Sequence, residues 1–246
     1  MKFLTDLHLC LPIWGMDQAR QLIEKSSELG YDAVGISFDL RAMQREVQDL
    51  RDACNTFGVD LVTRANLMPR NPAGLLKNLS NLRRKFEVIA VVCSSKAVAR
   101  QAAKDRRVDI LSFPSTDTRK RFFDSAEAEL ASRGTASVEI DMAPLLCLQG
   151  SQRIRLLSCL RKETRVASKY DVPIILSSGA DNANLLRTPE EYAYLSYLFG
   201  LDFPDAMRGF SENPQSIVNR NRKRLNSSYI APGVYLVRRG KDCPDV

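Results

Sequence analysis

Short apolar runs rich in β-branched residues recur along the chain. Seven of them lie at residues 2–9, 33–38, 59–65, 86–93, 108–113, 136–140 and 172–177, and a weaker one lies at 206–210. Each run has the length and the residue types of a buried strand. The pattern therefore predicts seven or eight strands spread over most of the chain.

Helical patterns fill the intervals between these runs. Apolar positions recur at helical spacing in residues 17–29, 40–57, 95–104, 119–133, 151–170 and 211–224. The segment Thr188-Pro189-Glu190-Glu191 predicts one more helix start, because Thr caps helices, Pro fits the first turn and acids favour the helix dipole. That helix is expected to run through residues 192–199 and to stop at Gly200.

Strands that alternate with helices indicate a parallel sheet with right-handed crossovers. A closed (β/α) barrel and an open doubly wound sheet both fit this order. The length of 246 residues is close to the ~250 of a typical barrel. The glycine-rich loops of nucleotide-binding open sheets do not occur. We therefore predict a TIM-barrel-like α/β fold over residues 1–224, followed by a basic C-terminal extension at 225–246.

Composition removes several classes of protein and of site. No apolar run approaches the ~18 residues of a membrane span, and Asp6 interrupts what would be the apolar part of a signal peptide. The six cysteines form no C-x-x-C pair, which favours a reducing compartment, and we expect the cytoplasm. His8 is the one histidine, so a metal site built on several histidines is excluded, and we expect no cofactor.

The positive charge is concentrated near the C-terminus. The chain has 36 Lys and Arg against 29 Asp and Glu, a net charge of +7. Residues 217–241 contain no acid and seven basic residues, namely Arg220, Arg222, Lys223, Arg224, Arg238, Arg239 and Lys241. Without these seven the charges balance. Such a segment favours a polyanionic partner, although a solvated basic helix is the alternative.

Candidate chemistry gathers where strands of a barrel end. Two strands carry such residues: Asp6 and His8 lie on the first, and Glu139 and Asp141 on the sixth. They could act as the paired carboxylates and the base of a hydrolase, or they could form hydrogen bonds that cap loops at a barrel mouth. Arg64, charged within an apolar run, indicates either a ligand contact or a structural ion pair. A turn is expected after the seventh strand, at Ser177, Ser178, Gly179 and Ala180, with Arg187 nearby. Its backbone amides could bind a phosphate, or its Ser and Gly residues could only allow the chain to turn tightly.

Several segments together resemble a known family. They are TDLH at residues 5–8, LGYDAVGI at 29–36, FEVIAV at 86–91, VDIL at 108–111, VEID at 138–141, ILSSGA at 175–180, LRTP at 186–189, YLFGL at 197–201, SENP at 211–214, IVNRNR at 217–222 and PGV at 232–234. In order and spacing they are similar to the TIM-barrel protein subunit of archaeal and eukaryotic ribonuclease P (protein component 3, the thirty-kilodalton subunit), and the archaeal members especially.

This resemblance implies a barrel related to the metal-dependent PHP phosphoesterases, and a protein that is not itself the catalyst. In that family the RNA subunit removes the 5′ leader of precursor tRNA. The protein pairs with an RRM-like subunit, in a heterodimer or heterotetramer, and works with other ribonuclease P proteins. Asp6 and His8 then look like the remnant of a phosphoesterase motif.

Three functions follow as hypotheses. The first is an RNA-binding subunit that meets precursor tRNA indirectly, with no membrane partner; its expected RNA contacts are Arg187, Arg220, Arg222, Lys223 and Arg224, and more weakly Arg64, Arg119 and Lys120. The second is a stand-alone PHP-like metal-dependent phosphoesterase that uses Asp6, His8, Glu139 and Asp141. The third is a phosphate-ligand-binding barrel that uses the turn at residues 177–180.

Overall fold

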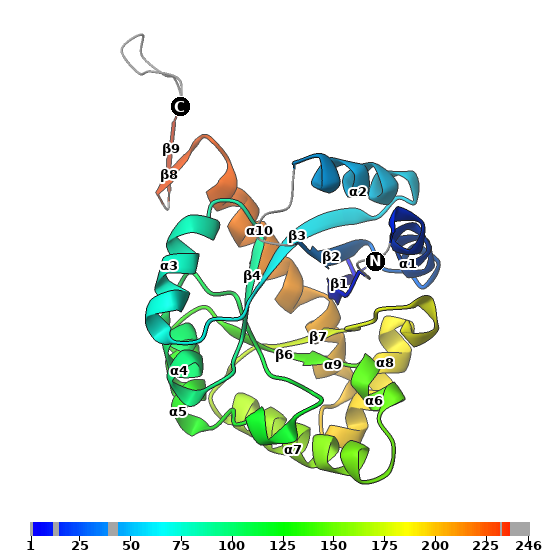
Figure 1. Ribbon diagram of the computed structural model, residues 1–246, viewed down its shortest axis with the longest axis vertical. Coiled ribbons are helices and arrows are strands. Elements are labelled where there is room, and N and C mark those ends of the chain that lie inside the picture. The colour runs from blue at the N-terminus through cyan, green and yellow to red at the C-terminus, as the bar shows by residue number, and fades with distance from the viewer. Residues whose placement is uncertain (1, 12–14, 39–43, 232, 237–246) are drawn as a thin grey trace.

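Seven strands form one parallel sheet that curls into a barrel (Figure 1). The computed structural model describes residues 2–11, 15–38, 44–231 and 233–236. In chain order and in sheet order the strands are β1 (Thr5–Leu9), β2 (Ala33–Ser37), β3 (Asp60–Leu67), β4 (Val88–Val92), β5 (Ile110–Ser112), β6 (Ser137–Asp141) and β7 (Ile174–Ser177). The predicted barrel is confirmed.

Helices cover the outer side of the sheet and one end of the barrel (Figure 1). They are α1 (Met16–Glu28), α2 (Gln44–Thr56), α3 (Pro72–Leu82), α4 (Lys96–Lys104), α5 (Ser125–Ser132), α6 (Ala143–Cys147), α7 (Gly150–Lys169), α8 (Pro189–Ser196), α9 (Phe203–Phe210) and α10 (Glu212–Leu225), with short 3₁₀ turns η1 (Thr118–Lys120), η2 (Ala183–Leu185) and η3 (Tyr197–Phe199). Thr188 caps α8 in a reciprocal capping box with Glu191, as the sequence predicts. None of these described helices combines the length and apolarity that a membrane crossing needs.

The barrel closes between β7 and β1 without a full ladder. Leu9 and Ala180 form an isolated parallel bridge, in which the Cys10 amide donates to the Ala180 carbonyl at 2.9 Å. The Gly179 amide donates to the His8 carbonyl, also at 2.9 Å. These bonds join the loop after β7 to the end of β1, so the mouth formed by the carboxyl ends of the strands is closed on this side.

Residues 206–210 form the end of helix α9, so the weak prediction of an eighth strand there was wrong. Asp202 caps α9 by accepting from the Asp205 amide at 2.9 Å. Ala206 and Phe210 are four residues apart and both are buried, which is helical spacing. A Cβ on Gly209 would lie 3.0 Å from a Leu176 side-chain carbon, so the missing side chain lets α9 pack closely on β7.

Two apolar layers hold the fold together. The larger one packs the helices against the outside of the sheet. The smaller one fills the barrel interior and comprises Leu7, Ala33, Val62, Val88, Ala90, Ile110, Ile175, Ile217 and Val218. The last two belong to α10, so this helix closes the end of the barrel where the strands begin.

Strand β1 is irregular in a way that shapes the mouth. Its pairing register with β2 shifts between Asp6 and Leu9. The backbone of Leu7 passes so close to Gly35 that a Cβ there would lie 2.3 Å from the Leu7 carbonyl oxygen. Only glycine fits at this position, and the irregularity interrupts the simple alternation of side chains along β1.

The chain after α10 leaves the barrel. Strands β8 (Tyr229–Ala231) and β9 (Val234–Tyr235) pair antiparallel and extend away beyond the end of α10 (Figure 1). The rings of Tyr229 and Tyr235 pack edge to face at 5.9 Å. This hairpin is the described part of the predicted C-terminal extension.

Candidate functional site

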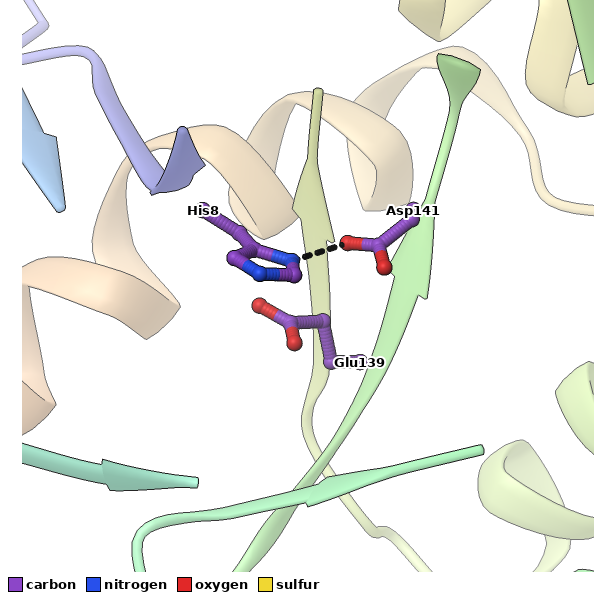
Figure 2. A group of neighbouring side chains, drawn as sticks. All are labelled: His8, Glu139 and Asp141. Carbon is purple, nitrogen blue, oxygen red and sulfur yellow. Dashed lines mark hydrogen bonds and ion pairs between the residues drawn. The ribbon is translucent and has the colours of Figure 1, made fainter. Parts of the chain in front are cut away.

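The barrel mouth brings together three groups that the sequence singled out. The imidazole of His8 faces the carboxylate of Asp141, and Glu139 lies beside them (Figure 2). His8 Nδ1 is 2.8 Å from Asp141 Oδ1. One potential ligand atom from each of the three residues lies within 4.8 Å of the others. A base and two carboxylates, three of the four residues predicted for this cluster, therefore lie close together.

Arg64 occupies the centre of the barrel beneath this mouth. Its Nη1 and Nη2 atoms each donate to a Glu139 carboxylate oxygen at 2.6 Å, a bidentate pair, and both side chains are fully buried. Nη1 also donates to the Leu7 carbonyl, and Nε donates to Asn66 Oδ1. The prediction that Arg64 contacts RNA was wrong, because its guanidinium has no exposed surface. It forms the structural ion pair that was the alternative.

The mouth does not fit a metal ion. A divalent cation would need the carboxylate of Glu139, but both oxygens of this group already accept from Arg64, and one also accepts from Ser177 Oγ at 2.8 Å. The guanidinium supplies the positive charge that a cation would bring, and it cannot lose its proton. A cation beside it would be repelled in a buried setting. His8 and Asp141 alone fall short of the three protein ligands of a catalytic zinc site.

His8 and Asp141 form an ion pair that shifts the pKa of each partner. Burial and the nearby Arg64 both oppose protonation of His8, but the Asp141 carboxylate outweighs them and raises the His8 pKa well above its usual range. Burial disfavours the ionised Asp141, yet His8 and Arg64 lower its pKa. Both shifts favour the charged forms of the two partners, whereas Asn66 Nδ2, which lies 3.2 Å from His8 Nε2, favours an unprotonated Nε2.

The turn at residues 177–180 closes the barrel and offers no free amides. The Ser178 amide donates to Asp6 Oδ1 at 2.9 Å, and the Ala180 amide donates to the Ser178 hydroxyl at 3.2 Å. The Gly179 amide donates to the His8 carbonyl. The expectation that Ser177 to Ala180 bind a phosphate was therefore wrong. These residues form a structural turn, because the amides of residues 178–180 are bonded to β1 and to the turn itself.

Asp6 takes part in this closure. Its Oδ1 accepts the amides of His8 and Ser178, whereas its buried Oδ2 has no hydrogen-bond partner among the described residues. Burial raises the pKa of this carboxyl, although the hydrogen bond from Ser178 partly opposes the rise. Asp6 thus ties β1 to the loop after β7.

Apart from Arg64, the predicted RNA contacts outside α10 lie on the surface. Arg187 is half-buried, and its guanidinium donates to the carbonyls of Asn184 and Leu186. Arg119 is exposed and forms an ion pair with Asp117, and Lys120 pairs with the same carboxylate. Their role in RNA binding stays a prediction.

The basic residues of α10 divide into two sets. Arg220 donates to Asp109 at 2.9 Å, and Arg222 binds both Asp60 and Glu87 at 2.5 and 2.6 Å. Neighbouring Lys223 and Arg224 are exposed, and no carboxylate among the described residues pairs with them. Arg238, Arg239 and Lys241 lie outside the described residues.

The acids that receive α10 were missed by sequence reasoning, although a signal was present. Asp60 begins β3, Glu87 precedes β4 and Asp109 precedes β5. Asp109 is buried, and besides Arg220 it binds Asn221 and Arg83 at 2.8 and 2.6 Å. An acid at or just before the start of each of three successive strands marks a shared contact at that end of the barrel. Arg220 and Arg222 therefore fasten α10 to the strands.

Comparison with known proteins identifies relatives over nearly the whole chain. Residues 5–226 match the model of the family described as RNase P subunit p30. A protein from Methanococcoides burtonii named ribonuclease P protein component 3 is 30% identical over 220 residues, which cover 89% of this chain and 88% of the relative. Its namesake from Methanosarcina mazei is 30% identical over 231 residues, covering 93% and 92%.

The fold also matches a chain in a solved assembly. That chain comes from a cryo-EM structure of archaeal ribonuclease P with mature tRNA. It superposes with a TM-score of 0.82 over 97% of the present chain and 100% of its own length, at 20% identity. At that identity the likeness supports the barrel fold.

Proposed function

The chain belongs to the RNase P subunit p30 family and is a protein subunit of ribonuclease P, and we propose that it binds and supports the RNA without supplying a catalytic group. Ribonuclease P is a ribonucleoprotein endoribonuclease, so the chain shares in the removal of 5′ leaders from precursor tRNA. The observation that carries the non-catalytic role is the buried Arg64–Glu139 pair, which occupies the centre of the barrel mouth.

RNA recognition in this proposal rests on exposed cations. Arg119, Lys120, Lys223 and Arg224 are exposed, and Arg187 is half-buried. Lys and Arg on a surface bind the phosphate backbone and release counterions, which gives an affinity that falls with salt. Structured RNA is recognised largely through its shape and backbone rather than through base edges, and such contacts suit a supporting subunit.

Other protein subunits complete the proposed assembly. We infer an RRM-like subunit as the direct protein partner, in a heterodimer or heterotetramer, with further ribonuclease P proteins and with precursor tRNA met indirectly. The cytoplasm is the proposed compartment. Exposed apolar side chains such as Tyr194, Tyr197 and Leu198 offer surface of the kind that protein contacts use.

One observation favours a second function, a stand-alone metal-dependent phosphoesterase. The potential ligand atoms of His8, Glu139 and Asp141 lie within 4.8 Å of one another. This alternative requires Glu139 to leave Arg64, which would strand a buried guanidinium without its partner at a cost of several kcal/mol. The non-catalytic proposal requires no such rearrangement.

Reconstitution tests the proposal against this alternative. Precursor tRNA is incubated with ribonuclease P RNA and the other protein subunits, with and without this chain, and release of the 5′ leader is followed. The proposal predicts that adding the chain raises the cleavage rate, whereas the chain alone with Mn²⁺ or Zn²⁺ cleaves neither precursor tRNA nor a simple phosphodiester. Metal-dependent cleavage by the chain alone, lost in His8→Ala, would establish the phosphoesterase instead.

A further inference from the structure

A groove of about 530 Å³ lies at the end of the barrel opposite the mouth. Five arginines and part of the C-terminal hairpin line it: Arg83, Arg84, Arg106, Arg107, Arg224, Tyr229 and Ile230. Arg83 and Arg84 follow α3, Arg106 and Arg107 follow α4, and Arg224 lies in the last turn of α10. Three segments far apart in the sequence thus place arginines around one hollow, which we name the arginine groove.

Two of these arginines are committed to the fold. Arg83 donates to Asp109 at 2.6 Å and to the Glu87 carbonyl at 3.2 Å. Arg107 grips the Asp105 carboxylate with two hydrogen bonds, at 2.9 and 2.7 Å. Both guanidinium groups are therefore occupied by partners within the fold.

The other three arginines of the groove form no ion pair within the described part of the chain. Arg84, Arg106 and Arg224 are exposed, and no Asp or Glu in the part of the chain that the structure describes forms an ion pair with them. Three guanidinium groups around one hollow repel one another, and a bound anion relieves that repulsion. An arginine presents its donors in a planar fork that matches phosphate oxygens.

The hairpin adds apolar and aromatic surface to the rim of the groove. Ile230 is 61% exposed, and Val234 and Tyr235 are about half exposed. An isolated two-stranded hairpin is marginally stable in water, so one that projects from a domain gains order from a partner. Tyrosine rings beside guanidinium groups provide stacking surfaces for unpaired bases, and that combination is typical of contacts to RNA.

We propose that the arginine groove is a binding site for the phosphate backbone of RNA, with Arg84, Arg106 and Arg224 as its contacts and Tyr229 at its rim. This rests on the proposed function, since it names a face of the subunit that meets RNA. It differs from the sequence-based expectation, because Arg84 and Arg106 lie outside the basic C-terminal segment. Arg224 is shared by both, while Arg220 and Arg222 face the strand acids.

Matched triple variants of the full chain test the groove. The first carries Arg84→Ala, Arg106→Ala and Arg224→Ala. The control carries Arg155→Ala, Lys162→Ala and Arg165→Ala, which removes three exposed cations from α7 and gives the same net charge. A third variant replaces the three groove arginines by lysine. Equilibrium binding of each purified chain to labelled ribonuclease P RNA is measured over a range of salt concentrations, after thermal melts show that all variants fold.

The groove variant is expected to bind the RNA at least about tenfold more weakly. The slope of log affinity against log salt concentration should become shallower by about two to three, because three phosphate contacts are lost. The α7 control should match the wild-type chain, and the lysine variant should retain most of the affinity. Equal weakening in both alanine variants, or an unchanged groove variant, would overturn the assignment. The assignment would also be overturned if the groove variant lost binding to an acidic protein subunit while its affinity for the RNA stayed unchanged.

The proposed function has its own readout in the same samples. A wild-type chain that neither binds the RNA nor raises leader cleavage in the reconstituted mixture contradicts the subunit function itself. A wild-type chain that does both, beside a groove variant that behaves identically, contradicts the groove alone. The two failures are therefore distinguishable.

Discussion

Arg64 explains how a barrel with a base and two carboxylates at its mouth serves as a scaffold. Its guanidinium bonds to Glu139, to the Leu7 carbonyl and to Asn66, so one side chain links β3 to β6 and β1. Buried charges are tolerated only when they are paired and hydrogen-bonded. This network meets that condition.

Removal of Arg64 alone should destabilise the fold strongly. Arg64→Met leaves the Glu139 carboxylate buried without a partner, and we expect a loss of about 3–5 kcal/mol in the free energy of unfolding. The double variant Arg64→Met with Glu139→Leu removes both charges and should recover most of that loss. Urea unfolding of both proteins measures this. A single variant within 1 kcal/mol of wild type, or a double variant less stable than the single, would contradict the ion pair's role.

The His8–Asp141 pair predicts a pH dependence of stability. The folded-state pKa of His8 is raised, so its contribution is complete below the unfolded value of about 6.5 and is lost as the pH rises through the folded value. The folded-state pKa of Asp141 is lowered, so its contribution is present above the unfolded value of about 3.9 and is lost as the pH falls.

Accordingly, the wild-type chain should lose stability relative to His8→Asn as the pH is raised from 6 to 8.5. Urea midpoints at several pH values, with Asp141→Asn as a second variant, give the comparison. Parallel curves for wild type and His8→Asn over that interval would show that the pair does not titrate as described.

Among the elements, helix α10 is held to the barrel both by apolar packing and by ion pairs. Ile217 and Val218 fill the barrel interior, while Arg220 and Arg222 pair with acids at the starts of the strands. The helix therefore closes the barrel from below, as the loop after β7 closes it at the mouth.

Arg222 and Lys223 are adjacent in α10, but Arg222 faces the strand acids and Lys223 faces solvent. Substituting each in turn therefore compares the two faces of the helix. Arg222→Met leaves Asp60 and Glu87 without their partner, and we expect a loss of about 1–2 kcal/mol, moderated because the pair is partly exposed. Lys223→Met should change the free energy of unfolding by less than about 0.5 kcal/mol. Equal effects of the two substitutions in urea unfolding would refute the docking role of Arg222.

Most elements could be predicted from the sequence because they follow local rules. The seven strands show as apolar runs, and Thr188 with Pro189 and Glu191 marks the start of α8. Helix α3 was missed, although Asn71 caps it and Pro72 stands at its first position. The predicted helix at 119–133 begins only at Ser125, where Asp124 forms a capping box; a 3₁₀ turn precedes it.

At the scale of the whole molecule, charge summed along the chain differs from charge in space. The sequence places the whole excess in residues 217–241, but Asp60, Glu87 and Asp109 neutralise part of α10. Arg84 and Arg106, which lie far from the C-terminal segment in the sequence, line the arginine groove together with Arg224. The groove could not be predicted from the sequence, because residues more than 100 positions apart line it together.

The mouth shows the same limit. The sequence places His8, Glu139 and Asp141 at strand ends, but it leaves open whether Arg64 reaches a ligand or an acid. That choice depends on the register of β3 against β4 and of β6 against its neighbours, which brings Arg64 to Glu139 across the barrel. Residue types were sufficient to find the cluster, and the structure was needed to show that it is closed to a metal ion.

Cleavage by the assembled enzyme shows whether this subunit supplies a catalytic group. Ribonuclease P is reconstituted with wild-type or His8→Gln chain, equal incorporation is checked, and the rate of 5′-leader removal from precursor tRNA is measured. Because His8 is buried beside Asp141 and supplies no catalytic group, we expect the two rates to lie within about twofold of each other. A fall of about 10²–10⁴-fold in an intact complex, the loss expected when a general acid or base is removed, would contradict it.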